Sequence, residues 1–299
     1  MTFALPRNIQ LKLEQTLAQW CHWHCAPVLT RAPEVVRVLT PGVSNFSVLV
    51  RAEQHFVVRI DGLNPSAHGL SRQTEWRTLE AAHRAGLAPA PRYCNPELGS
   101  LVCDYLAPED AHVVKVADVA RLLRAIHSLP ARHHRLDLGE RILRYEKQIE
   151  HRGRSLGDAL RNCHHQVAAL LRAMSRQPAD RVLCHNDLLR ANRIYSAGRL
   201  WAVDWEYAAM ASPWYDIAVV INGDSLSASD TDALLIAYLG RVADERERDM
   251  LHQYGCIYRY LELLWYLALD KQMLEPSAIE KKSSALLNML NGAQSSRES

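Results

Sequence analysis

The stretch CHNDLLRANRI at 184–194, followed by DWEYA at 204–208, constrains this chain more than any other feature. It places the oxygen-bearing side chains of Asp187, Asn192 and Asp204 beside short apolar runs that are typical of strands. These runs are RVLC ending at Cys184, RIY at 193–195 and LWAVD at 200–204. We expect Asp187 and Asn192 in a loop between strands and Asp204 at the end of the next strand, so that the three side chains form an oxygen-rich cluster.

Such a cluster suits a magnesium ion, which prefers one or two carboxylates together with substrate phosphates. If Asn192 and Asp204 hold the metal, Asp187 is available to accept a proton from a hydroxyl group. Phosphoryl transfer divides its work in this way. The catalytic loop of protein kinases also has its Asn five residues after its Asp, which is the spacing of Asp187 and Asn192.

The first third of the chain alternates short apolar runs with polar turns, which favours an antiparallel sheet. We expect strands at 35–39, 46–51 and 55–60, then a helix at 71–84 and two further strands around RYC and SLVCDYL. The helix ends before Gly86, because Pro89 and Pro91 prevent its continuation. This sheet with one helix is expected to end near Leu106.

The remainder reads as mainly helical, which makes the expected fold class α+β. Apolar residues recur at helical spacing in VADVARLLRAIHSL (116–129), HHQVAALLRAM (164–174) and TDALLIAYL (231–239). The predicted domains are 1–106 and 107–299, with the boundary near APEDAH at 107–112. The last residues, 291–299, read as a polar tail.

Composition excludes several classes of protein. A net charge of +2 provides no clustered basic face, so we expect no nucleic-acid partner. The most apolar stretch, 254–269, contains Arg259 and Glu262, so we expect no membrane span. The first residues do not resemble a secretory signal, and seven irregularly spaced cysteines suggest reduced thiols, so we expect a cytoplasmic protein. Nothing in the pattern specifies an oligomeric state.

HNDLLRAN at 185–192, followed by VDWEYAAMASPWYDIA at 203–218, resembles the superfamily of choline kinases and aminoglycoside phosphotransferases. The form is most similar to the bacterial choline/ethanolamine kinase branch, with thiamine kinases close by, and the likeness covers nearly the whole chain. It implies a two-lobed, protein-kinase-like fold. The N-lobe, an antiparallel sheet plus helix, would bind the nucleotide, and the mainly helical C-lobe would carry catalysis and substrate binding.

Transferred to this chain, the resemblance makes Asp187 the catalytic base and makes Asn192 and Asp204 the ligands of Mg²⁺. Glu206 would contact metal or substrate. Three further residues receive structural roles: Asp216 would bind the backbone of the catalytic loop, and His185 and His127 would support it. Arg190, inside the same loop, receives no role.

The resemblance also implies an ATP site in the N-lobe. The loop PGVSNFS, with Gly42, Ser44 and Asn45, would cover the phosphates, although it has one glycine where relatives often have two or more. Arg59 would take the place of the phosphate-binding lysine of protein kinases and pair with Glu75; the alternative is that both are ordinary surface charges. The backbone of the linker residues would receive the adenine: Asp104, Tyr105 and Leu106.

Near the C-terminus, Tyr258, Glu262 and either Trp265 or Tyr266 recur at helical spacing, and Tyr254 extends this stripe by a turn. Aromatic faces beside a carboxylate favour a cation, above all a quaternary ammonium group. The alternative is that these aromatic side chains simply pack the helix into the C-lobe.

We therefore predict an ATP- and Mg²⁺-dependent kinase that phosphorylates the hydroxyl group of a small, cationic alcohol such as choline or ethanolamine. Alternative acceptors are thiamine, and then aminoglycosides or sugars. A nucleotide-binding pseudokinase is disfavoured because Asp187, Asn192 and Asp204 are all present. A metal-dependent hydrolase, which would not need ATP, is the third class.

One other cluster, CHWHC at 21–25, suggests zinc by its residue types. Its spacing lacks the separated ligand pairs of a structural zinc site. It follows the amphipathic segment IQLKLEQTLAQW, and we interpret it as the end of an N-terminal helix.

Overall fold

The computed structural model describes residues 5–41, 45–109, 112–175, 180–269 and 273–295. The chain divides into two compact units. Unit 1 consists of 1–129 and 191–208, and unit 2 consists of 130–190 and 209–299. These units do not follow the lobes expected from the sequence, 1–106 and 107–299, and that division stays a prediction.

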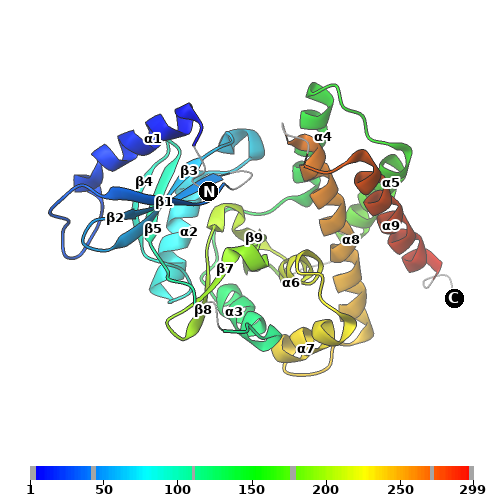
Figure 1. The fold of residues 1–299 in the computed structure, drawn as a ribbon. Coiled ribbons are helices and arrows are strands. Elements are labelled where there is room, and N and C mark those ends of the chain that lie inside the picture. The colour runs from blue at the N-terminus through cyan, green and yellow to red at the C-terminus, as the bar shows by residue number, and fades with distance from the viewer. Residues whose placement is uncertain (1–4, 42–44, 110–111, 176–179, 270–272, 296–299) are drawn as a thin grey trace. The chain divides into compact units, whose positions relative to one another are not determined.

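Unit 1 is built on a five-stranded antiparallel sheet of order β1-β2-β3-β5-β4 (Figure 1). Its strands are β1 (Glu34–Pro41), β2 (Asn45–Arg51), β3 (His55–Asp61), β4 (Pro91–Asn95) and β5 (Ser100–Asp104). The other elements of the unit are α1 (Arg7–Ala18), α2 (Arg72–Arg84), α3 (Val116–His127), the hairpin β7 (Arg193–Ser196) and β8 (Arg199–Ala202), and the short 3-10 helices η1 (Trp20–His22), η2 (Pro65–His68) and η4 (Trp205–Tyr207).

The two faces of β3 differ in chemistry because successive side chains point to opposite sides of a strand. Phe56, Val58 and Ile60 are fully buried in an apolar core with Ile9 and Leu13 of α1. The intervening Arg59 and Asp61 are also buried, and they form ion pairs with side chains of α2. One strand therefore contributes to an apolar core on one face and to a charged cluster on the other.

Helix α2 begins and ends at recognisable signals. The Ser71 side chain accepts a hydrogen bond from the Thr74 N–H and caps the first turn. After the last turn, Gly86 adopts a φ of 73°, a left-handed conformation that glycine reaches without a steric cost. The helix occupies 72–84, in agreement with the expected 71–84.

Unit 2 is mainly helical. Its elements are α4 (Leu138–His151), α5 (Asp158–Met174), β6 (Val182–Cys184), β9 (Ala209–Ala211), α6 (Pro213–Gly223), α7 (Ala228–Leu239), α8 (Glu245–Ala268) and α9 (Pro276–Ser295). Strands β6 and β9 pair with each other. Helices α4, α5, α6, α8 and α9 share one apolar core, in which Tyr145, Ile257, Tyr260 and Leu264 are buried.

The α+β class and the antiparallel sheet are confirmed. Three details differ from expectation. Strand β8 ends at Ala202, so Asp204 lies two residues beyond it. Helix α1 ends at Ala18, so 21–25 lies past the helix, and Trp23 and Cys25 pack into the core of unit 1. The beginning of the expected polar tail belongs to α9.

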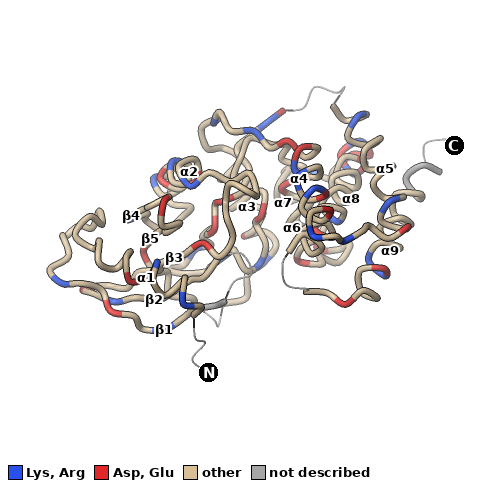
Figure 2. The backbone as a smooth tube through the Cα atoms, turned by 90° about the horizontal axis from the view of Figure 1, so that it is seen from above, with Lys and Arg blue, Asp and Glu red and all other residues tan. Residues whose placement is uncertain are grey.

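Among the described residues, none of the helices is both long and apolar enough to cross a membrane. In each unit, basic and acidic segments are interspersed along the described chain (Figure 2). Within this same part of the chain, residues 21–25 contribute to no group of three metal-ligating side chains.

Candidate active site

Arg59 is one of two cations in a buried ion-pair cluster of unit 1. Its Nη2 donates to Glu75 Oε2 at 2.6 Å, and its Nη1 donates to Asp204 Oδ1 at 2.6 Å. The ion pair expected between Arg59 and Glu75 is therefore present. Burial alone would raise the pKa of Glu75, yet the guanidinium groups of Arg59 and Arg72 hold it below its ordinary value.

Arg72 is the second cation of the cluster. Its Nε and Nη2 donate to the two carboxylate oxygens of Asp61 at 3.0 and 2.5 Å. Its Nη1 donates to Glu75 Oε2 at 2.7 Å and to Glu206 Oε2 at 2.9 Å. Asn45, at the start of β2, donates to the same Glu206 oxygen at 3.0 Å.

The sequence reasoning missed Arg72 and Asp61, although a signal was present. Arg72 is the first residue of α2, where the helix dipole disfavours a cation. Its carboxylate partner Glu75 follows three residues later on the same helix face. An arginine at such a position indicates nearby acidic groups.

The cluster carries excess negative charge and exposes one of its carboxylates. Four carboxylates, those of Asp61, Glu75, Asp204 and Glu206, face two guanidinium groups, which leaves two negative charges within these six side chains when all four carboxylates are ionised. Glu75, Asp61 and Glu206 expose only 2, 3 and 4% of their side chains, whereas Asp204 exposes 30%. Oxygen donors with surplus negative charge fit a divalent cation such as Mg²⁺, and Asp204 is the accessible carboxylate.

The hairpin β7–β8 sets Asp204 near Asn192. The Val203 N–H donates to the Asn192 carbonyl oxygen at 2.9 Å, so the backbone of Asn192 lies beside the residue that precedes Asp204. Asp204 has a φ of 62°, an uncommon value outside glycine that is characteristic of functional turns. Desolvation and the charge of Glu206 raise the pKa of Asp204 to about 7, although Arg59 opposes this shift.

Of the three linker residues expected to bind adenine, two already use their backbone N–H groups in hydrogen bonds within unit 1. The Asp104 N–H donates to the Ala90 carbonyl and the Tyr105 N–H to the His55 carbonyl, so both donors are used within unit 1. Among the described residues, the Leu106 N–H has no hydrogen-bond partner. The Asp104 carboxylate accepts two hydrogen bonds from Arg92, at 2.7 and 2.6 Å. Of the phosphate loop, Gly42 and Ser44 lie outside the described residues.

In unit 2, Asp216 holds the first half of the loop that contains Asp187. Its two carboxylate oxygens accept the backbone N–H groups of His185 and Asn186 at 2.9 and 2.8 Å. Asp216 and His185 are fully buried. These are the backbone hydrogen bonds that the resemblance implies for Asp216.

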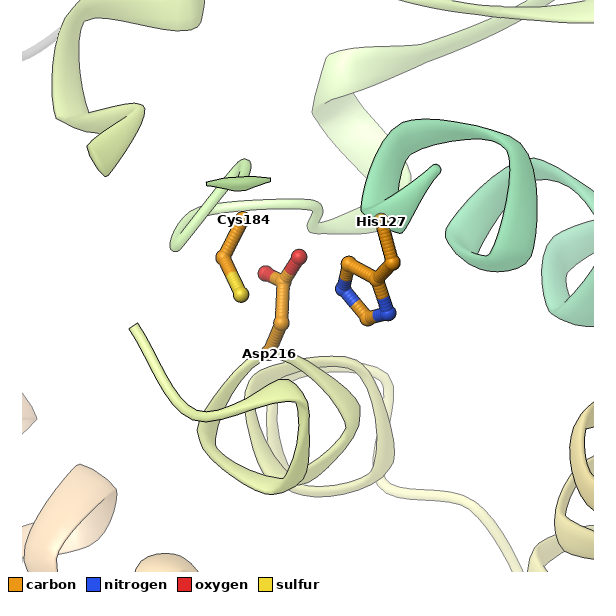
Figure 3. Close-up of side chains that lie close together, drawn as sticks. All are labelled: His127, Cys184 and Asp216. Atoms are coloured by element: carbon orange, nitrogen blue, oxygen red, sulfur yellow. The ribbon is translucent and has the colours of Figure 1, made fainter. Parts of the chain in front are cut away.

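Cys184 adjoins Asp216 in Figure 3, which also labels His127, the last residue of α3. Burial and then the charge of Asp216 raise the pKa of the Cys184 thiol well above its ordinary value. The thiol donates weakly to the carbonyl oxygens of Ala211 and Ser212. The contacts of the thiol with two carbonyl groups and of the carboxylate with two backbone N–H groups give this pair a structural role in holding the loop.

The second half of the loop is held at the opposite end of α6. Asp224, the C-cap of α6, accepts the backbone N–H of Arg190 at 3.0 Å. Gly223 permits close packing there, because a Cβ at this position would clash with Leu189 Cδ2. Asp187 is half-buried between these two anchors, and the Leu189 N–H donates to its carbonyl oxygen at 2.8 Å.

The predicted acceptor stripe lies on α8 of the same unit. Burial raises the pKa of the Tyr258 hydroxyl, and the negative charges of Glu262 and Asp187 raise it further. Glu262 is half-buried and pairs with Lys282 of α9 at 3.2 Å. Trp265 is half-buried, packs against the apolar core and makes an edge contact with Tyr266. The stripe therefore contributes to core packing and also carries the polar groups of Tyr258 and Glu262.

Comparison with known proteins decides the family. The sequence model of the phosphotransferase enzyme family matches residues 35–251, well over half of the chain. This chain belongs to the phosphotransferase enzyme family. The predicted phosphotransferase class is thereby confirmed.

Solved structures confirm the kinase-like fold of this phosphotransferase. A choline/ethanolamine kinase family protein from Mesorhizobium loti is 23% identical with a TM-score of 0.71, over 93% of this chain and 94% of that chain. Choline kinase LicA from Streptococcus pneumoniae is 21% identical with a TM-score of 0.71, and the match covers 89% of this chain and 96% of that chain. Protein LicA of Haemophilus influenzae is 34% identical over 87 residues, 28% of this chain. The phosphotransferase spans a quarter to a third of the length of the curated relatives it matches, 26 to 33%.

The predicted site residues of the phosphotransferase fall into two sets. Unit 1 contains Asn45, Arg59, Glu75, Asn192, Asp204 and Glu206, with the linker 104–106, and unit 2 contains His185, Asp187, Asp216, Tyr258, Glu262 and Trp265. Unit 1 joins Arg59, Glu75, Asp204 and Glu206 in one ion-pair cluster. The assigned roles of the individual residues stay predictions.

Replacing Asp216 with Asn is expected to destabilise the phosphotransferase by about 1–3 kcal/mol, the usual cost of leaving a buried donor without its acceptor. An amide offers one acceptor oxygen where the carboxylate offers two, so one of the His185 and Asn186 N–H groups loses its partner. Urea unfolding measures the change. Asp158→Asn, at an exposed side chain of α5, is the control. Equal stability of both variants would contradict the anchoring role of Asp216.

Proposed function

We propose that this phosphotransferase moves the γ-phosphoryl group of ATP to the hydroxyl group of a small cationic alcohol, choline or ethanolamine. The observation that carries the proposal is the placement of Tyr258 and Glu262 four residues apart on one face of α8. The Tyr258 hydroxyl lies beside Gly223, which also packs against Leu189 in the loop that contains Asp187. A proton acceptor thus lies in the same unit as an aromatic and acidic surface suited to a cation.

ATP is the proposed donor, and the solved LicA complex with AMP supports it by analogy of fold. The Leu106 N–H is the proposed donor to the adenine ring, because the neighbouring N–H groups of Asp104 and Tyr105 are used internally. Arg59 is the proposed phosphate ligand. Its Nη1 now donates to Asp204, and phosphate oxygens would replace that carboxylate as acceptor.

Asn192 and Asp204 are the proposed ligands of Mg²⁺. Their oxygen donors, the surplus negative charge of the cluster and the exposure of Asp204 all fit this ion. When bound, the ion would offset the negative charge of the ATP phosphates. Glu206 is proposed as a structural support, because its Oε2 already accepts hydrogen bonds from Arg72 and Asn45.

Asp187 is proposed to accept the proton of the acceptor hydroxyl group while the hydroxyl oxygen attacks the γ-phosphorus of ATP. The new bond joins that oxygen to phosphorus, and the bond between the γ-phosphorus and the bridging oxygen of ADP breaks. The anchors Asp216 and Asp224 fix the loop on both sides of Asp187, so the carboxylate is held before the substrate binds.

A coupled ADP-release assay tests the proposal with choline, ethanolamine, thiamine, aminoglycosides and amino sugars as acceptors. We expect the highest kcat/KM for choline or ethanolamine. A preference for thiamine or for a sugar would overturn the acceptor assignment, and the absence of ADP release with every acceptor would overturn the proposed activity itself.

Replacing Trp265 with Ala, or Glu262 with Gln, is expected to raise the KM for the acceptor and to leave the KM for ATP nearly unchanged. Cation–π attraction amounts to about 0.5–2 kcal/mol, which corresponds to about a 2- to 30-fold change in KM. Glu280→Gln, which removes an exposed carboxylate from α9, is the matched control for charge. If the variants lose stability without a change in the ratio of the two KM values, the stripe residues pack the core and do not bind the acceptor.

A further inference from the structure

We infer that Arg72 is a positioning residue for this reaction: it holds Glu75 and Glu206 so that Arg59 and Asp204 are directed toward the nucleotide and the metal. The inference rests on the proposed function. Arg72 itself is buried and belongs to neither the proposed metal ligands nor the proposed phosphate ligands.

All three nitrogen atoms of the Arg72 guanidinium are in use. Nε and Nη2 form a two-pronged contact with Asp61 at the end of β3, at 3.0 and 2.5 Å. Nη1 lies between Glu75 and Glu206, at 2.7 and 2.9 Å. One side chain thereby connects β3, α2 and η4 within unit 1.

The sharing of Glu75 determines where Arg59 points. Glu75 Oε2 accepts from Arg59 at 2.6 Å and from Arg72 at 2.7 Å, while Glu75 Oε1 is buried with no partner among the described residues. If Arg72 were absent, both Glu75 oxygens could turn to Arg59 in a two-pronged pair, which is the preferred geometry of arginine with carboxylate. That pair would use Nη2 together with Arg59 Nε, which is buried and has no partner among the described residues. The guanidinium group would turn toward Glu75, and the direction of Nη1 at Asp204 would change.

The contact with Glu206 acts on Asp204 through the backbone. Glu206 lies two residues after Asp204 in η4, and Asp204 is the N-cap of that short helix with a φ of 62°. A backbone in this uncommon conformation persists only when its surroundings determine it. The bonds from Arg72 and Asn45 to Glu206 supply that constraint.

The positive charge alone does not explain why position 72 is an arginine. Its hydrogen bonds to three carboxylates require the planar guanidinium group, whose N–H donors point in fixed directions. A lysine ammonium is a compact charge on a flexible stem and lacks the fixed fork that pairs with both Asp61 oxygens while reaching Glu75 and Glu206. Arg72→Lys therefore preserves the charge of the cluster and removes its geometry. This makes it the informative variant.

The experiment compares Arg72→Lys with Arg241→Lys, a control at a two-pronged ion pair with Glu247 in unit 2. We expect Arg72→Lys to lower kcat about 10²-fold, the effect of a displacement of about 1 Å at a reacting centre. We expect the apparent affinity for Mg²⁺ to fall about 10-fold, as measured by the increase in melting temperature with ADP and Mg²⁺ relative to ADP with EDTA. Arg241→Lys should change neither value.

Glu206→Gln provides a second test that does not depend on the folding of the lysine variant. It keeps the shape of the side chain and weakens the contact with Arg72, so the loss of Mg²⁺-dependent stabilisation should recur. The inference is overturned if both variants retain the Mg²⁺ dependence and kcat of the wild type, or lose only stability. If the wild type releases no ADP with any acceptor, the proposed function fails, while the Mg²⁺-dependent shift still tests Arg72.

Discussion

Replacing Asp187 with Asn is expected to lower kcat by about 10²–10⁴-fold, the usual contribution of a general base. The amide has the shape of the carboxylate but does not accept the proton of the acceptor hydroxyl. The KM for ATP should change little, because the proposed ATP ligands Arg59 and Leu106 belong to unit 1. The loss should be the same for every acceptor, since each of them must release its proton.

The variant should fold normally, because the loop is held through groups other than the Asp187 side chain. The N–H groups of Asn186 and Arg190 are bound by the acidic residues at the two ends of α6, Asp216 and Asp224. Thermal unfolding with and without ADP and Mg²⁺ provides the control, and the nucleotide-induced shift should equal that of the wild type. Wild-type kcat in this variant would remove Asp187 from the mechanism.

Local pattern was enough to predict the sheet and the phosphotransferase class. Short apolar runs separated by polar turns indicated the strands, and Val48, Val50 and Val58 of these runs are fully buried. The five-residue spacing of Asp187 and Asn192 indicated phosphoryl transfer, and the family match confirms the phosphotransferase class. Both signals depend on residues close together in the chain.

The parts of the cluster that depend on distant residues could not be predicted in the same way. Arg72 and Glu206 are 134 positions apart, and their contact exists only because η4 packs beside α2. Sequence periodicity contains no information about such a pair. The end of β8 at Ala202 was also missed, because Val203 continues the apolar run as far as Asp204 and only the φ of Asp204 reveals the turn.

Replacing Asp204 with Asn is expected to abolish Mg²⁺-dependent transfer to every acceptor alike. The amide removes the accessible negative charge from the proposed metal site, while its oxygen can still accept the hydrogen bond from Arg59. Activity at several Mg²⁺ concentrations, with choline and with ethanolamine, measures the effect. Recovery of full activity at high Mg²⁺, or loss with one acceptor only, would show that Asp204 is not the essential ligand.

The same substitution should stabilise the protein without Mg²⁺, which separates a functional residue from a structural one. The pKa of Asp204 is raised to about 7 from an ordinary value of 3.8, first by desolvation and then by the charge of Glu206. Between these values the folded state binds more protons than the unfolded state, so stability falls as the pH rises from about 4 to about 7. The amide of the Asp204→Asn variant carries no such charge, and the advantage of the variant should be absent near pH 4 and complete at pH 8. Melting temperatures of the wild type and the variant, measured in EDTA at both pH values, test this expectation. If the wild type is the more stable protein at pH 8, the ion pair of Asp204 with Arg59 outweighs the repulsion of Asp204 by Glu206.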